Sequence, residues 1–190
     1  MKLHIFGASG SGVTTLGQAI ANRLDVPYFD SDNYFWKNTE QPFTERYNAE
    51  ERNLRIIADL EKHDDWILGG SVINWGDHVF PTFDLIVFLY LPKEIRIERL
   101  KKREFERYGD QLCSDQKKLK KFENFINWAS DYDDNSGIAN RTLHAHEKWI
   151  AKANTKILKL VGDLTIEEKM KQILEILNEE KLLPARIKQI

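Results

Sequence analysis

A glycine-rich stretch near the start of the chain contains the residues best suited to chemistry. Residues 7–15 read GASGSGVTT, and they lie between an apolar run at residues 2–6 and a helical apolar pattern at residues 16–24. Glycines let several backbone N–H groups point into one concavity, and the N-terminus of the next helix adds a positive partial charge. A strand, a glycine-rich loop and a helix in this order predict a loop that binds phosphate or triphosphate.

One position of this loop departs from the pattern G-x-x-x-x-G-K-[ST] of phosphate-binding loops. Gly7, Gly12 and Thr14 match the pattern, whereas Val13 stands where a lysine normally contacts the β and γ phosphates. The backbone N–H groups and a hydroxyl able to ligate Mg²⁺ are retained, so we expect phosphate binding and leave the catalytic strength open. A glycine-rich turn that binds nothing is the alternative. The predicted nucleotide-binding residues are Gly7, Ser9, Gly10, Ser11, Gly12, Val13, Thr14 and Thr15.

Polar or small residues follow two further apolar runs. Asp30 and Asp32 end the run at residues 26–32, and Gly69 and Gly70 end the run that begins at Trp66. Ligands of open parallel sheets gather at the carboxyl ends of the strands, and alternate residues of a strand point the same way. The two carboxylates are therefore expected to converge beside the glycine-rich loop, although a polar turn would have the same sequence. The paired glycines permit close approach of a ligand to the backbone.

Five apolar runs alternate with helical patterns, which predicts an α/β fold with a central parallel sheet of five strands. The runs are at residues 2–6, 26–32, 66–71, 85–91 and 155–161. Helices are expected at 16–24, from 42–44 onward with Leu54, Ile57 and Ala58 as the buried face, at 93–108 and at 166–177. Asn48 with Glu51 and Thr165 with Glu168 have the spacing of capping boxes, and the aromatic cluster at 33–37 is expected in a loop.

The expected helix at residues 93–108 carries arginines at spacings of three and four, which predicts one stripe on its surface. These residues are Arg96, Arg99, Arg103 and Arg107. Glutamates on the same helix could pair with them. Alternatively, the far end of the helix lies over the phosphates, and Arg103 and Arg107 supply the charge that Val13 does not. Arg46, Arg52 and Arg55 are interpreted mainly as surface charges.

The segment after this helix differs in composition and is interpreted as an inserted helical lid at approximately residues 104–140. Lysines cluster at residues 117–121, an apolar helical pattern follows, and a short helix contains His144 and His146. Residues two apart do not share a helix face, so we expect no metal site at these histidines. The whole chain, residues 1–190, is then a single domain with this insertion.

The composition limits the remaining possibilities. The 190 residues carry a net charge of −2, so nucleic acid is not an expected partner, and only the lysine cluster argues for it. Cys113 is the single cysteine, which is compatible with a reducing cytoplasm. The chain starts with an expected core strand rather than a signal pattern, and its apolar runs are too short to span a bilayer. We therefore expect a cytoplasmic protein without a membrane partner.

The order of these motifs resembles the nucleoside and small-molecule kinase branch of P-loop proteins, in which shikimate kinases and adenylate kinases are found. The likeness covers nearly the whole chain. The segments at residues 7–17, 30–36, 75–77 and 141–149 are more closely similar to a bacterial group labelled adenylate-kinase-like or AAA-type ATPase. The resemblance implies a P-loop NTPase-type three-layer αβα sandwich, with ATP and Mg²⁺ as cofactors.

The resemblance also implies roles for individual residues. Thr14 would ligate Mg²⁺ directly and Asp30 through water, and Asp32 would bind the acceptor hydroxyl and accept its proton. Gly69 and Gly70 would contact the substrate. The implied catalytic residues are Asp32, Arg103, Arg107 and Arg141.

Together these features predict a kinase that transfers the γ-phosphoryl group of ATP to a small molecule, either a nucleotide or a hydroxylated metabolite. The alternative is a protein that binds a nucleotide and uses lid closure as a switch, without kinase turnover; Val13 favours it. A monomer and a homodimer are both compatible with the sequence.

Overall fold

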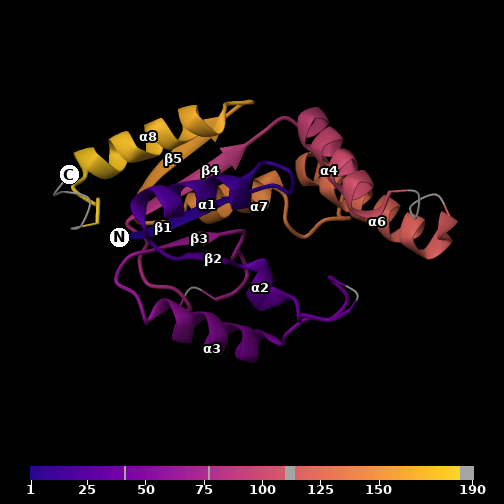
Figure 1. The fold of residues 1–190 in the computed structure, drawn as a ribbon, viewed down its shortest axis with the longest axis horizontal. Helices are drawn as coiled ribbons and strands as arrows, with labels where there is room; N and C mark the ends of the chain where they lie inside the picture. Colours follow the sequence, from indigo (N-terminus) through magenta and orange to yellow (C-terminus); the bar gives the residue numbers. More distant parts are fainter. Residues whose placement is uncertain (41, 77, 110–113, 185–190) are drawn as a thin grey trace.

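The computed structural model describes residues 1–40, 42–76, 78–109 and 114–184 of the chain. Its centre is one sheet of five parallel strands in the order β2-β3-β1-β4-β5 (Figure 1). The sheet confirms the predicted α/β architecture. The strands are β1 (Lys2–Gly7), β2 (Tyr28–Asp30), β3 (Trp66–Gly69), β4 (Leu85–Tyr90) and β5 (Lys156–Val161).

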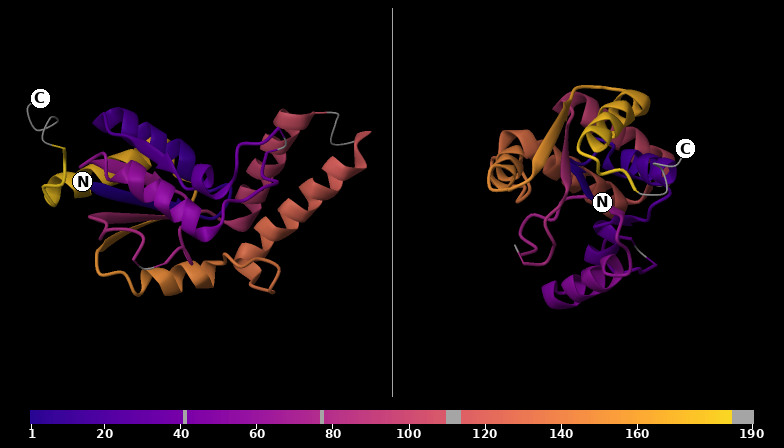
Figure 2. Two further views of the ribbon diagram at one scale, coloured as in Figure 1. Left: turned by 90° about the horizontal axis from the view of Figure 1, so that it is seen from below. Right: turned by 90° about the vertical axis from the view of Figure 1, so that its left-hand side faces the viewer.

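Helices cover both faces of the sheet, because successive strand residues point to opposite sides. On one side, Leu3 and Ile5 pack against α1 (Val13–Leu24) and α8 (Ile166–Glu179) in one core cluster. On the other side, Phe6 packs in a second cluster with residues of α3 (Ala49–Leu60) and α7 (Leu143–Ile150). Figures 1 and 2 show this layered arrangement, which is the predicted three-layer sandwich.

Two long helices extend beyond the carboxyl ends of the strands. Helix α4 (Lys93–Tyr108) follows β4 directly after Pro92, and α6 (Gln116–Asp134) packs beside it. In the left view of Figure 2 the pair stands away from the sheet. A short helix, α2 (Asp32–Phe35), begins at the end of β2. The elements that bear the candidate site therefore meet at one edge of the sheet.

The first turns of several helices are fixed by the side chains predicted from sequence. Asn48 accepts a hydrogen bond from the Glu51 N–H at 2.8 Å, at the start of α3. At the start of α8, Thr165 accepts from the Glu168 N–H at 3.1 Å, and the Glu168 carboxylate accepts from the Thr165 N–H at 2.7 Å. This reciprocal pair is a complete capping box.

The segment between β2 and α3 differs from the expectation in two ways. Residues 32–35 form the helical turn α2 rather than a loop, and no helix begins at residues 42–44. The antiparallel bridge of Trp36 with Arg46, and the hydrogen bond from the Tyr47 N–H to the Phe35 carbonyl, hold the chain extended up to the cap of α3.

The buried face of α3 was predicted correctly only in part. Its buried residues are Arg52, Ile56 and Leu60, and the predicted Ile57 is half-buried and packs against the same core cluster. Leu54 is 62% exposed and Ala58 is exposed. Ile56 and Leu60, four residues apart, fit a helical periodicity as well as the predicted residues do. Periodicity alone therefore could not tell which of the two sets is buried.

Cys113, and Asp77 at the end of the segment 75–77 noted in the sequence analysis, lie outside the described residues. Within the described residues, no helix combines the length and apolar character needed to cross a bilayer.

Candidate functional site

The predicted phosphate-binding loop connects the end of β1 to the start of α1. Gly12 is the N-cap of α1 with φ of 91°, and Gly10 has φ of 83°, a region of backbone conformation that favours glycine. At Gly7 a Cβ would lie 2.5 Å from the Leu89 carbonyl oxygen of β4. The loop can therefore take this path only with glycine at these positions.

The loop has open space at Gly12 and a buried hydroxyl at Ser11. A Cβ added at Gly12 would meet no atom of the protein within 4 Å. The Ser11 hydroxyl is buried and has no hydrogen-bond partner among the described residues. Val13 packs against the core cluster that contains Leu16. The loop therefore fits a phosphate group held by main-chain N–H groups, whereas position 13 contributes only an apolar contact.

Thr14 and Asp30 lie together beside the loop. The Thr14 hydroxyl donates to Asp30 Oδ2 at 3.0 Å, and the Tyr28 hydroxyl donates to the same oxygen at 3.1 Å. The Asp32 N–H donates to Asp30 Oδ1 at 3.0 Å. A hydroxyl and a carboxylate are the protein ligands that Mg²⁺ uses beside substrate phosphates. The two residues predicted as metal ligands are thus in direct contact.

Tyr28 was not predicted as a site residue. Its ring fills the space that side chains at Gly17 and Gly69 would occupy, since added Cβ atoms would lie 2.3 Å and 2.0 Å from it. Its hydroxyl then reaches Asp30. Burial and the Asp30 charge raise the pKa of this tyrosine, so it remains a hydrogen-bond donor. A tyrosine two residues before a candidate metal ligand on a strand was the available signal, because such residues share one face.

The paired glycines at the end of β3 make room for the residues around the carboxylates. A Cβ on Gly70, which has φ of 94°, would lie 2.0 Å from Ser31 Oγ. The Ser31 N–H donates to the Gly69 carbonyl at 2.8 Å. These contacts account for both glycines through packing, and their contact with a substrate remains a prediction.

Asp32 begins α2 and is open to solvent on one side. Surrounding protein atoms and the neighbouring Asp30 charge raise its pKa, while the positive charges of Arg141 and Arg103 lower it. Arg141 lies two residues before the start of α7, and in the sequence it follows the segment that contains α6. The fold thus brings together Asp32 and two of the three predicted catalytic arginines.

Aromatic rings hold the guanidinium groups near α2. Arg141 lies over the Phe35 ring at 5.4 Å, and Arg46 lies over the same ring at 5.3 Å. Burial is the main reason that the pKa of Arg141 is lowered, and the Arg46 charge lowers it further. Arg52 was expected on the surface but is buried, with its guanidinium 4.0 Å from the centre of the Trp75 ring.

The arginines of α4 do not form the predicted single surface stripe. Arg96 is completely buried. Arg103 and Arg107 both contact Glu104, at 3.3 and 3.2 Å, as the ion-pair alternative predicts. Arg107 also lies 5.9 Å from the ring centre of Phe43, which belongs to the segment between α2 and α3.

His146 belongs to a buried polar chain rather than to a metal site. Its ring nitrogens are hydrogen-bonded to Ser71 Oγ at 2.9 Å and to the Tyr132 hydroxyl at 2.8 Å. Burial, followed by the charges of Arg141 and His4, lowers its pKa to about 3. This chain joins the end of β3 to α6 and α7.

Comparisons with known proteins agree with this geometry. The sequence model of the AAA domain family matches residues 4–124. The YqaC protein of Bacillus subtilis (strain 168) is 40% identical over 177 residues, which are 93% of this chain and 97% of YqaC. Cytidylate kinase 2 of Borreliella afzelii (strain PKo) is 30% identical over 60% of this chain and 68% of its own length.

Among solved structures, deoxyadenosine kinase of M. mycoides with bound dATP aligns with a TM-score of 0.56 over 94% of this chain and 100% of that chain. The two sequences are 14% identical, so this likeness concerns the fold. Taken with the glycine-rich loop between β1 and α1, these matches show that the chain belongs to the AAA domain family and has a P-loop kinase-like fold.

Proposed function

We propose that this protein is a phosphotransferase that uses ATP and Mg²⁺ to phosphorylate a small molecule. The observation that carries the proposal is the contact of Thr14 with Asp30, next to the phosphate loop and two residues before Asp32. In this proposal, the metal site, the phosphate site and the base would lie side by side. The kinases among the relatives and the solved structures support the reaction class.

The chain offers a separate group for each requirement of phosphoryl transfer, which depends mainly on positioning and charge neutralisation. Main-chain N–H groups of the loop would hold the phosphates, with Ser11 Oγ as an additional polar group. Thr14 and Asp30 would hold Mg²⁺, which when bound neutralises phosphate charge. Arg103 and Arg107 would approach the phosphates from α4, at the start of a proposed lid at approximately residues 104–140 of a single domain.

The surroundings of Asp32 favour an acceptor that carries both a hydroxyl and an anionic group. Asp32 would orient the hydroxyl and accept its proton, since a carboxylate within hydrogen-bond reach can act as a general base. Arg141 and Arg46, which both lie over the Phe35 ring, would bind the anionic group. Phosphorylated sugars, nucleotides and carboxylated alcohols meet this description.

The test incubates the protein with ATP, Mg²⁺ and a metabolite extract, and identifies products by mass spectrometry. We expect one or a few metabolites to gain a phosphoryl group while ADP appears. The variants Thr14→Ala and Asp32→Asn should each abolish most of this product. ATP binding without any phosphorylated metabolite, across extracts that contain the anionic alcohols, would contradict the proposal.

A nucleotide-binding switch is the second candidate, and two observations favour it. Val13 packs into the core, and Arg103 and Arg107 are both paired with Glu104. The variant Val13→Lys separates the two functions, because it restores a cation at the phosphates. A kinase whose other residues already supply the charge should change little in rate, whereas a switch should gain measurable phosphoryl transfer. Gln18→Lys adds the same charge to an exposed position of α1 and is the matched control.

A further inference from the structure

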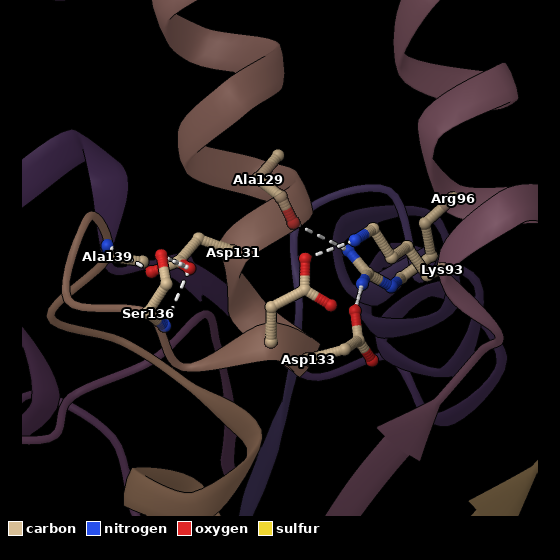
Figure 3. A network of polar contacts seen from close by, with 8 residues as sticks. Lys93, Arg96, Ala129, Asp131, Asp133, Ser136 and Ala139 are labelled. Atoms are coloured by element: carbon tan, nitrogen blue, oxygen red, sulfur yellow. Dashed lines mark hydrogen bonds and ion pairs between the residues drawn. The ribbon is translucent and has the colours of Figure 1, made fainter.

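Arg96, in the first turn of α4, contacts three separate parts of the chain although it is fully buried. Figure 3 shows its contacts with Ala129 and Asp133 of α6. Its Nε donates to the Leu91 carbonyl at 3.0 Å. Its Nη1 lies 3.3 Å from the Ser9 carbonyl oxygen and 3.4 Å from that of Ala129. Its Nη2 forms an ion pair with Asp133, near the end of α6. A guanidinium keeps its charge when buried, so it requires such partners.

The contact with Ser9 fixes the orientation of one peptide unit of the phosphate loop. The C=O and N–H of a trans peptide point in opposite directions, and the described chain contains no cis peptide bond. Because the Ser9 carbonyl faces Arg96, the Gly10 N–H points away from it. Helix α4 also packs on Gly10, where a Cβ would lie 2.9 Å from the Arg96 carbonyl oxygen. Arg96 therefore determines how the loop presents this N–H group.

On its other side, Arg96 is connected to the segment that leads to Arg141. Asp133 Oδ1 is buried and has no hydrogen-bond partner among the described residues, so the ion pair through Oδ2 is its main stabilising contact. Two residues earlier, Asp131 accepts hydrogen bonds from the N–H groups of Ser136 and Ala139, at 2.8 and 2.7 Å (Figure 3). The end of α6 is thus joined both to α4 and to the chain just before Arg141.

We propose that Arg96 is a positioning residue that couples the phosphate loop to the end of α6, through Ser9 on one side and Asp133 on the other. Order in the loop and order at the end of α6 are then linked, and this linkage is reciprocal. The phosphate-binding role of the loop rests on the proposed function. The coupling itself is a property of the protein without nucleotide, so it can be tested independently.

The first test measures hydrogen–deuterium exchange by mass spectrometry in the nucleotide-free protein. Asp133→Asn is expected to speed exchange of the amides in residues 7–12 about tenfold, which lies in the lower part of the usual range of coupling. The matched control is Asp134→Asn, which removes the neighbouring ion pair between α6 and Lys93 of α4. It should leave exchange in residues 7–12 unchanged. Equal exchange in the two variants would show that Arg96 only joins two helices, and would overturn the coupling.

The second test perturbs the loop and observes α6. Gly10→Ala places a methyl group against the Arg96 carbonyl and is expected to speed exchange in residues 129–139 about fivefold. Gly162→Ala, at a glycine with a similar φ of 95° and no protein atom within 4 Å of an added Cβ, is the control. Unchanged exchange in residues 129–139 of Gly10→Ala would overturn the proposal. If the Asp133→Asn variant does not fold, this second test alone decides the question.

A third measurement adds a fluorescent ATP analogue with Mg²⁺. In the wild-type protein, binding should slow exchange in residues 129–139, and Asp133→Asn should remove this effect while weakening affinity about tenfold. Slowing that persists in Asp133→Asn would contradict the coupling. A wild-type protein that binds no nucleotide would overturn the proposed function instead, and the two nucleotide-free tests would still decide whether Arg96 couples the loop to α6.

Discussion

The carboxylate of Asp32 lies between charges of opposite sign. Asp30 raises its pKa together with the loss of water around it, whereas Arg141 and Arg103 lower its pKa. The balance is a raised pKa, which makes Asp32 a better proton acceptor than an ordinary aspartate. Because the base must be ionised, activity is expected to fall on acidification at a pH above the usual aspartate pKa of 3.8.

The Arg141→Gln variant tests this balance. It removes a positive charge that favours the ionised form, so the pKa of Asp32 rises further and the acidic limb of the kcat profile moves to higher pH. The profile is measured with the acceptor identified in the mass-spectrometric screen. Arg46→Gln is the control, because it removes the other guanidinium over the Phe35 ring. The Arg46 charge is not among the causes of the pKa shift of Asp32, so the acidic limb of the kcat profile should stay in place. If Arg141→Gln and the wild type have the same pH profile of kcat, the Arg141 charge does not lower the pKa of Asp32.

The sequence predicted the candidate site residues that belong to a local motif, but it did not predict which arginines are buried. The loop glycines and Asp30 follow or end strands, and Thr14 and Asp32 lie in the first turns of the next helices, where the sequence pattern indicates chemistry. Arg96 and Arg52 were placed on the surface because arginine usually is solvated. Their burial depends on acceptors and rings from distant segments, such as Asp133 and Trp75, which no local pattern reveals.

At the scale of single elements, α8 shows how a local signal fixes a boundary. Thr165 and Glu168 each satisfy a backbone N–H that the first helical turn leaves free. Thr165→Ala removes the hydroxyl acceptor and should lower the free energy of unfolding by about 1 kcal/mol, measured by urea titration. Thr165→Ser keeps an acceptor at the same position and is the control. A loss equally large in Thr165→Ser would show that the methyl group, rather than the hydroxyl, matters.

The same elements show which boundaries could be predicted. Helix α4 runs from Lys93 to Tyr108 as expected, because Pro92 precedes it and Gly109 follows it. The start of α3 was placed too early, although its cap, Asn48, was recognised from the sequence; the bridge between Trp36 and Arg46 keeps the preceding segment out of a helix. Local chemistry specifies the ends of α4 and α8, whereas pairing with another segment specifies the path into α3.

At the scale of the whole molecule, the second face of the sheet encloses two neutral histidines. His4, in the central strand β1, is hydrogen-bonded through Nδ1 to the Leu68 carbonyl at 3.1 Å and stacks with Phe6 and Phe83. Burial lowers its pKa from 6.5 to about 4. His146, on α7, has its pKa lowered to about 3. Both histidines are therefore uncharged in the folded protein at pH values where the unfolded chain protonates them.

This difference makes stability depend on pH in a defined direction. Between pH 6.5 and about 4 the unfolded state binds more protons than the folded state, so the free energy of unfolding falls as the pH falls. Each buried histidine contributes up to about 1.4 kcal/mol per pH unit in this window. Urea titrations at several pH values should show that His146→Gln has a flatter dependence than the wild type. His144→Gln, at an exposed histidine of the same helix, is the matched control. Equal slopes in the wild type and His146→Gln would mean that His146 becomes protonated without unfolding of the protein. The hydrogen bonds of His146 to Ser71 and Tyr132 argue against this outcome, because one of these partners would have to reorient when the ring is protonated.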